Sequence, residues 1–249
     1  MRLLFWNLGY AREIDGSLFE YLKNGRQIFS HSVDEQQAFI QSIVDEVKKI
    51  EPDIFLYSEI SKGSLRNKKF NQHTYLTSML QCETKSAASK YKSRLLKASP
   101  FHKGNMNGTC VFSEAIIENK HLKHGSKTLV QKVTYNEWVI FCVHLSLRAG
   151  ARAKQLEELA QWVNNLDANK NIILCGDFNT LGGEKELEHL CSATGLGMSS
   201  RAGDTFPAHN PTQRFDYFLY KSLDGLKPRI KTINIALSDH RPILCEFDV

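Results

Sequence analysis

The stretch of sequence that decides the fold runs Ile172-Ile173-Leu174-Cys175-Gly176-Asp177-Phe178-Asn179-Thr180. Its four apolar residues predict a short buried strand that ends at the glycine. Asp177 and Asn179 follow, and side chains two residues apart point the same way in extended chain. A carboxylate that can hold a metal or a water proton and an amide that can hold a phosphate oxygen would therefore face one spot. Such hard ligands suit magnesium, calcium or manganese better than zinc.

A strand end capped by Asp and Asn is also a common structural turn, so the rest of the sequence has to decide. A polar side chain able to bind metal or phosphate recurs at other predicted strand ends and in the loop entering the last strand: Asn7, Glu59, His144, Asp239 and His240. Each one alone reads as a structural residue. Because several coincide, we expect them to cluster at one rim of two packed sheets.

Length and composition are those of an ordinary globular protein. The chain has 249 residues, 42% hydrophobic and 24% charged, and we expect one domain over residues 1–249. The sequence has no apolar run of about 20 residues, so we expect no transmembrane segment, and we expect no signal peptide. Six cysteines without Cys-x-x-Cys spacing predict a reduced, cytoplasmic protein. Nothing indicates an obligate protein partner, and we expect a monomer.

Two segments suggest contact with an anion. Residues 62–103 hold ten Lys or Arg residues against the single acid Glu83, a formal charge of +9 within a chain of +5 overall. This bias predicts either a solvated face or a surface for an anionic substrate. Residues 8–31 form a long connection that mixes aromatic and basic residues, which suits either stacking on a substrate or anchoring to the core.

A buried carboxylate is expected in the strand that contains Asp216, because this residue lies among aromatic neighbours. A buried carboxylate needs a partner, and arginine or histidine is the natural kind. The capping box Ser32-x-x-Glu35 predicts the start of a helix that ends before Pro52.

Six motifs in this order resemble one known family, the endonuclease/exonuclease/phosphatase superfamily with the deoxyribonuclease I-like fold. The motifs are Trp6-Asn7, Ser58-Glu59, Val143-His144-Leu145, Gly176-Asp177-Phe178-Asn179, Arg214-Phe215-Asp216-Tyr217 and Ser238-Asp239-His240-Arg241-Pro242. The resemblance covers essentially the whole chain. It implies a four-layer α/β sandwich of two packed mixed β-sheets flanked by helices, and magnesium-dependent attack of water on a phosphate ester.

The resemblance also implies a role for each site residue. Glu59, Asn7 and Asp239 would hold Mg²⁺, with Mn²⁺ as the alternative. Asp177 would orient or deprotonate the attacking water, and Asn179 would bind the phosphate. The remaining catalytic residues would be His240, oriented by Asp216, and His144, one on each side of the scissile group.

Two further residues are expected to bind substrate, Asn107 and Arg148. Relatives of the deoxyribonuclease I type carry a glutamate near the position of Asn107, where it pairs with the first histidine. His144 therefore has no evident acidic partner in this sequence.

We expect a metal-dependent phosphodiesterase, with DNA or RNA as the favoured substrate. His144 resembles the deoxyribonuclease, sphingomyelinase and deadenylase branches, whereas Gly-Asp-Phe-Asn-Thr and Gln-Arg-Phe-Asp-Tyr differ from the inositol phosphatase motifs. Two alternatives stay open: a phospholipid or small-molecule phosphoester hydrolase, sphingomyelinase-like or phosphatase, and a catalytically idle module that holds an anionic partner.

Overall fold

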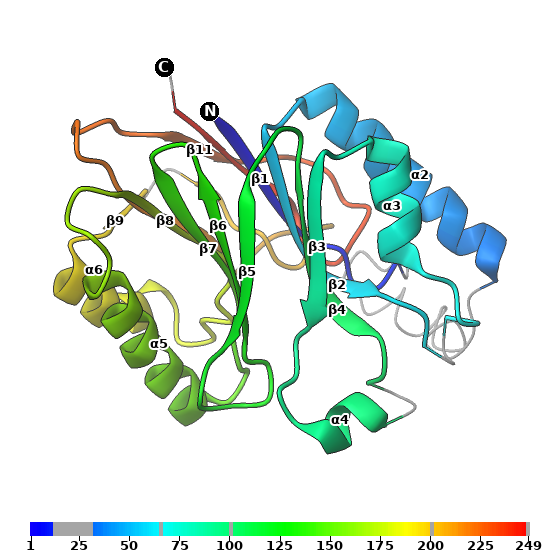
Figure 1. Cartoon of the computed structure of the whole chain (residues 1–249), viewed down its shortest axis with the longest axis horizontal. Helices are drawn as coiled ribbons and strands as arrows, with labels where there is room; N and C mark the ends of the chain where they lie inside the picture. Colours follow the sequence, from blue (N-terminus) through cyan, green and yellow to red (C-terminus); the bar gives the residue numbers. More distant parts are fainter. Residues whose placement is uncertain (12–31, 65–66, 100–101, 200–201, 248–249) are drawn as a thin grey trace.

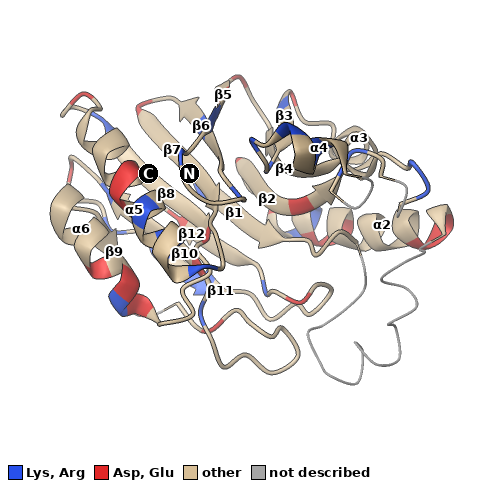
Figure 2. Cartoon of the chain, turned by 90° about the horizontal axis from the view of Figure 1, so that it is seen from below, with Lys and Arg blue, Asp and Glu red and all other residues tan. Residues whose placement is uncertain are grey.

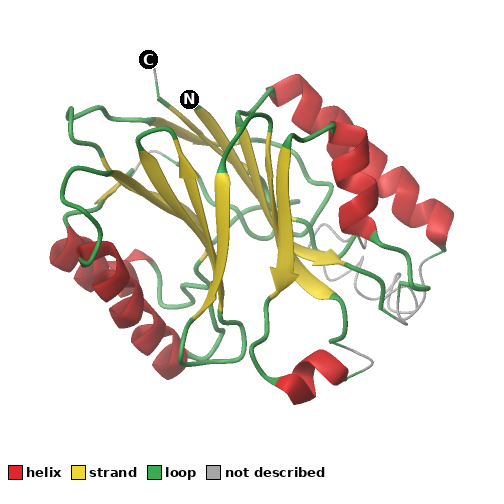
Figure 3. Ribbon diagram, in the orientation of Figure 1, coloured by secondary structure: helices red, strands yellow, loops and turns green. Residues whose placement is uncertain are grey.

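Two six-stranded β-sheets pack face to face and carry helices on their outer faces (Figures 1 and 3). The structure is a computed structural model. It describes residues 1–11, 32–64, 67–99, 102–199 and 202–247. The expectation for residues 8–31 therefore lies largely outside the described residues and stays a prediction.

The first sheet has the strand order β11-β12-β1-β2-β4-β3. Its strands are β1 (Arg2–Asn7), β2 (Ile54–Ser61), β3 (Thr84–Ser89), β4 (Asn105–Val111), β11 (Arg229–Thr232) and β12 (Ile243–Glu246). Helices α2 (Val33–Ile50) and α3 (Gln72–Leu80) cover its outer face, and α4 (Arg94–Ala98) connects β3 to β4. The predicted capping box at Ser32 and Glu35 is confirmed at the start of α2, where such a cap stabilises a helix by about 1 kcal/mol.

The second sheet has the strand order β5-β6-β7-β8-β10-β9. Its strands are β5 (Ile116–His121), β6 (Leu129–Tyr135), β7 (Trp138–His144), β8 (Asn171–Asp177), β9 (Gly197–Met198) and β10 (Asp216–Lys221). Its outer face carries α5 (Ala149–Asn164), the 3₁₀ turn η1 (Glu184–Leu187) and α6 (Glu188–Thr194).

Three apolar clusters hold the four layers together. The middle cluster includes Leu3 and Phe5 of the first sheet and Ile173 and Cys175 of the second, all fully buried. The two outer clusters lie between each sheet and its helices. Alternate residues of β1 and β8 thus serve opposite faces of their sheets. The predicted four-layer α/β sandwich is confirmed.

The structure bears on two expectations, the lack of a transmembrane segment and the reduced state of the cysteines. None of the helices in the described residues has both the length and the apolar character needed to cross a bilayer. All six cysteines are free thiols, as predicted, and five of them are buried.

Two parallel strand pairs bring polar strand ends to one rim of the sandwich. β1 and β2 run parallel with Asn7 opposite Ser58, and β7 and β8 run parallel with His144 opposite Asp177. Because parallel strands end on the same side, each sheet delivers its strand-end residues to that rim. Gly176, with φ at +135°, lets β8 approach β7 closely just before Asp177.

Gly176→Ala is expected to destabilise the fold by more than about 2 kcal/mol. A Cβ at this position would lie 2.0 Å from the backbone oxygen of Val143, and the positive φ alone costs about 1–3 kcal/mol. Urea denaturation measures the loss. Gly150→Ala is the matched control, because a Cβ there meets nothing within 4 Å and the helical site favours alanine. Equal stability of the two variants would contradict this account of Gly176.

Candidate active site

Most of the predicted site residues meet at the rim where β1, β2, β7 and β8 end. Figure 2 views the molecule from below, toward this rim, and shows acidic and basic residues on the neighbouring elements. One side-chain hydrogen bond joins the two sheets there, since Asn7 Nδ2 donates to Asp177 Oδ2 at 3.1 Å. Both residues are almost completely buried.

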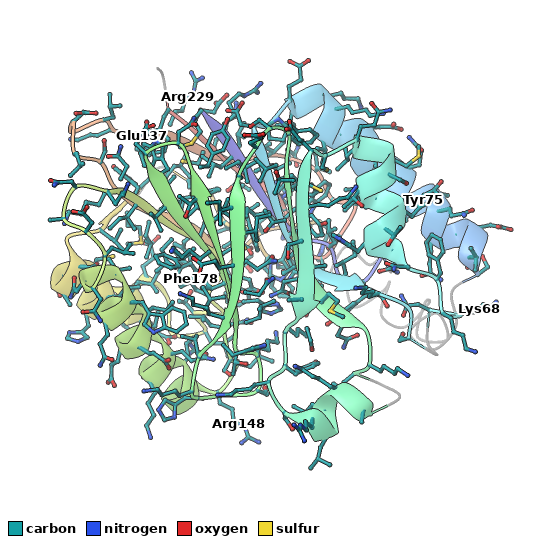
Figure 4. All side chains as sticks on the ribbon, viewed as in Figure 1. Lys68, Tyr75, Glu137, Arg148, Phe178 and Arg229 are labelled. Carbon is teal, nitrogen blue, oxygen red and sulfur yellow. The ribbon has the colours of Figure 1, made fainter. Side chains whose placement is uncertain are left out.

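Asp177 and Asn179 are fixed by the residue between them. Phe178 packs in the outer core of the second sheet (Figure 4), with its ring edge-on to Tyr217. The Asn179 backbone N–H donates to Asp177 Oδ1 at 2.9 Å, and Asn179 Nδ2 donates to the Leu145 carbonyl at 2.9 Å. Asn179 has φ at +52°, a conformation that asparagine tolerates better than most residues. The end of β8 therefore holds the side chains of Asp177 and Asn179 in fixed orientations.

Burial is the main cause that raises the pKa of Asp177 to about 6. The charge on His240 opposes this effect, and the charge on Asp216 adds to it. A carboxyl group that titrates near neutral pH is able to take a proton from water and release it again.

His240 and Asp216 form a buried ion pair. His240 Nδ1 lies 2.8 Å from Asp216 Oδ2, and the His240 carbonyl accepts a hydrogen bond from Trp6 Nε1 at 2.9 Å. Burial by itself would lower the pKa of His240, but the nearby carboxylates, Asp216 first, raise it to about 10. The imidazole is therefore cationic at neutral pH. The predicted histidine or arginine partner of Asp216 is confirmed as His240.

Glu59 is the central carboxylate on the first sheet. It stands at an irregularity in the pairing of β2 with β4, with φ at +57°, and its backbone N–H donates to Asn107 Oδ1 at 3.4 Å. Its Oε1 lies 2.9 Å from Lys90 Nζ and 3.9 Å from His144 Nε2. Burial would raise the pKa of Glu59, but Lys90 and Lys127 outweigh it and hold the carboxyl ionised.

Two lysines belong to the site and were not predicted as part of it. Lys90, which the sequence interpretation grouped with the basic surface of residues 62–103, is 3% exposed and pairs with Glu59. Lys127 comes from the turn between β5 and β6, contacts His144 Nε2 and lies 3.9 Å from Glu59 Oε1. Burial and the charge of Lys90 lower the pKa of Lys127 to about 8. Lys90 directly follows β3, but β3 reads Thr-Lys-Ser-Ala-Ala-Ser and is not an apolar run, so the strand-end pattern could not mark Lys90.

His144 has an acidic neighbour that the sequence did not reveal. Its Nε2 lies 3.3 Å from Asp177 Oδ2, across the parallel register of β7 and β8. Its Nδ1 has no hydrogen-bond partner among the described residues, which agrees with the missing acid near Asn107. Burial and then Lys127 hold the pKa of His144 well below its ordinary value, so the ring is neutral.

Asp239 and Arg148 differ in their placement. Asp239 Oδ1 lies 3.1 Å from Ser238 Oγ, and burial raises the pKa of Asp239, with Glu59 adding to the effect. Arg148 precedes α5, is exposed and projects outward at the lower rim (Figure 4). Across the described ranges, no contact joins Arg148 to the cluster, so its substrate role stays a prediction.

Oxygen atoms of the kind that a divalent cation needs are present on one side of the cluster. The tightest set of three ligand atoms, within 4.8 Å of one another, comes from Asp177, Asp216 and His240. The cationic His240 makes that set unsuitable for a metal. By contrast, the contacts of Glu59 all engage Oε1, which leaves Oε2 without a partner in the described part of the chain. Together with Asp239 and Asn7, it offers the hard oxygen ligands that magnesium prefers.

The chain belongs to the endonuclease/exonuclease/phosphatase family, whose model matches residues 5–240. Members of this family are hydrolases that act on phosphoesters. Among curated proteins, the uncharacterized protein YbhP of Escherichia coli strain K12 is 33% identical over 115 residues, which cover 43% of this chain and 45% of YbhP. The match thus spans about half the length of the curated relatives.

Solved structures show the same fold at low sequence identity. D. rerio TDP2 complexed with a single-strand DNA product superposes with a TM-score of 0.68, at 15% identity, over 100% of this chain and 99% of that one. Bacteroides thetaiotaomicron mannosyl-6-phosphatase Bt3783 gives a TM-score of 0.68 at 14% identity, over 100% of both chains.

Asp216→Asn is expected to move the pKa of His240 from about 10 to below its ordinary value of about 6.5, because burial then acts with less opposition. NMR titration of the His240 ring measures this directly. A histidine with a raised pKa stabilises the folded state fully below the ordinary pKa, and this stability is lost as the pH rises through about 10. The free energy of unfolding of the wild type, relative to the variant, should therefore fall across that window.

The exposed substitution Asp224→Asn serves as the control and should leave the titration of His240 unchanged. A His240 titration that is the same in Asp216→Asn and in the wild type would show that Asp216 does not hold its charge.

Proposed function

We propose that this protein is a metal-dependent phosphodiesterase that cleaves nucleic acid strands by activating a water molecule. The observation that supports it best is that one buried cluster holds both a carboxyl group able to accept a proton and a cationic imidazole. Asp177 titrates near neutral pH while His240, beside it, stays cationic. A base for water and a positive charge for phosphoryl oxygens are the two groups that phosphodiester hydrolysis needs from the protein.

Asp177 is the proposed base. Its hydrogen bonds with Asn7 and with the Asn179 backbone fix the carboxylate orientation. The Asn179 amide has two hydrogens, and the Leu145 carbonyl takes one. We assign the second hydrogen to a phosphoryl oxygen of the substrate.

His240 is the proposed electrostatic stabiliser. Asp216 accepts a hydrogen bond from the Nδ1–H of His240. The Nε2–H of the ring can then donate a hydrogen bond to a phosphoryl oxygen or to the leaving oxygen. His144 is neutral and lies between Asp177 and Lys127. We therefore assign it a role in positioning these two groups as well as in binding the phosphate.

We propose Mg²⁺ as the cofactor, held by Glu59, Asp239 and Asn7, with Mn²⁺ as the alternative. When bound, such a cation neutralises charge on the phosphoryl oxygens. Lys90 keeps Glu59 ionised without a metal, so the carboxylate is ready to bind a cation without first losing a proton.

Nucleic acid is favoured among diesters by the basic segment 62–103 and by the likeness to a TDP2 complexed with a DNA product. The six free thiols support the proposal of a cytoplasmic protein, and we propose that it acts as a monomer. A second candidate is a phosphomonoesterase. Lys90 and Lys127 supply the extra positive charge that a monoester dianion requires, and Bt3783 is a mannosyl-6-phosphatase.

Glu59→Gln is expected to abolish the rise in melting temperature that Mg²⁺ gives the wild type, because a ligand stabilises only the state that binds it. Asp177→Asn should keep this rise and lose about 10²–10⁴-fold in kcat. Thermal denaturation with and without Mg²⁺, together with a hydrolysis assay, separates the two roles. Near-normal hydrolysis by a folded Asp177→Asn variant would remove Asp177 from the mechanism.

The diesterase proposal predicts a higher kcat/KM for bis(p-nitrophenyl) phosphate than for p-nitrophenyl phosphate. A diester carries one negative charge, and in a nucleic acid its leaving group is an alkoxide that gains from a proton donor, which His240 can be. The same comparison is made with a short oligonucleotide that carries or lacks a terminal phosphate. Release of the terminal phosphate alone would instead establish the phosphomonoesterase candidate.

A further inference from the structure

A pocket of about 350 Å³ lies beside the active site, among the ends of three strands of the first sheet. This volume falls at the lower end of the range for small-molecule sites, about 300–1,000 Å³. The side chains that matter for its chemistry are Lys62, Asn71, Ser89, Lys97, Lys103 and Met106. They come from the residues after β2, from the cap of α3, and from the β3–α4–β4 connection.

The pocket and the active site share the same strand ends. Ser89 directly precedes Lys90, and Met106 directly precedes Asn107. Neighbouring residues in a strand face opposite sides of the sheet. Met106 packs with the cluster on the helix side, so the pocket and the catalytic cluster lie back to back at one rim.

The pocket carries positive charge that forms no ion pair with any acid among the residues that the structure describes. Lys62, Lys97 and Lys103 are exposed, and none of the three makes an ion pair within the described residues. The charge also acts on the neighbouring His73: burial and then Lys62 lower the pKa of His73 to about 4.

Polar donors add to the lysines. The Ser89 hydroxyl oxygen accepts from the Tyr91 backbone N–H at 3.3 Å, which leaves its hydrogen to donate. The side-chain oxygen of Asn71 caps α3, so the two hydrogens of the Asn71 amide are able to donate to a ligand. Lysine, amide and hydroxyl donors together are the groups that contact phosphate oxygens in nucleic acids.

We propose that this pocket binds a phosphate of the substrate strand that lies a short way along the chain from the scissile phosphate. The inference rests on the proposed function, and it names the substrate as a strand with several phosphates. A nucleic acid strand that crosses the rim can place one phosphate in the catalytic cluster and another in the pocket at the same time. A single phosphoester fills the catalytic cluster and leaves the pocket empty.

The test compares a pocket variant, Lys62→Gln/Lys97→Gln/Lys103→Gln, with a control variant of equal charge, Lys48→Gln/Lys170→Gln/Lys227→Gln. The control lysines precede β2, β8 and β11 at the opposite rim. The probe is a short fluorescein-labelled single-stranded oligonucleotide. Its binding is measured by anisotropy in EDTA over a series of salt concentrations. Hydrolysis of bis(p-nitrophenyl) phosphate in Mg²⁺ is measured separately.

The pocket variant is expected to lose at least tenfold in affinity for the oligonucleotide. The slope of log K against log salt should fall in magnitude by about 0.7, the value for one phosphate neutralised on a single strand. Hydrolysis of bis(p-nitrophenyl) phosphate should stay unchanged, and the control variant should bind like the wild type.

Unchanged oligonucleotide binding by the pocket variant would overturn the inference, and so would an equal loss in the control variant. Failure of the wild type to hydrolyse either bis(p-nitrophenyl) phosphate or the oligonucleotide would instead overturn the proposed function. Because binding is measured without a metal, the two failures are distinguishable.

Discussion

The hydrogen bond from Asn7 to Asp177, 3.1 Å long, is the interaction on which the geometry of the site depends. Asn7 ends a strand of the first sheet and Asp177 ends a strand of the second. The apolar cluster between the sheets sets their spacing but has no directional preference. A directional bond at the rim fixes which strand ends face one another. The loop that carries His240 is tied to β1 by two further hydrogen bonds. Trp6 Nε1 donates to the His240 carbonyl, and the Ser238 hydroxyl donates to the Asn7 carbonyl at 2.7 Å.

Charge balance explains how so many ionisable groups can be buried together. An isolated buried carboxylate would take up a proton. Glu59 avoids this through Lys90 and Lys127, and Asp216 is matched by His240. Asp177 has only weaker compensation and is the group whose pKa moves toward neutrality. The same arrangement that keeps the fold stable thus leaves one carboxylate able to exchange protons.

Much of the site could be predicted because parallel strands end together. A polar residue directly after an apolar run marked Asn7, His144 and Asp177, and the structure brings them into contact. Lys127 could not be found this way, since its contact with His144 depends on the β6–β7 register, Val130 opposite Val143, and no local pattern fixes that register. The position of Arg148 does not follow from strand ends, because α5 begins directly after it and its side chain projects outward; its role in substrate binding stays a prediction.

The left-handed backbone at Glu59 and Asn179, with φ at +57° and +52°, has a consequence for how the protein can change over time. Glycine would occupy either conformation without steric cost. Glycine at position 59, however, would leave the buried Lys90 without its partner, and glycine at position 179 would lose the hydrogen bond to the Leu145 carbonyl. Relief of backbone strain and loss of these contacts therefore oppose each other, so a search for heat-resistant variants is expected to retain Glu59 as long as Lys90 stays buried beside it.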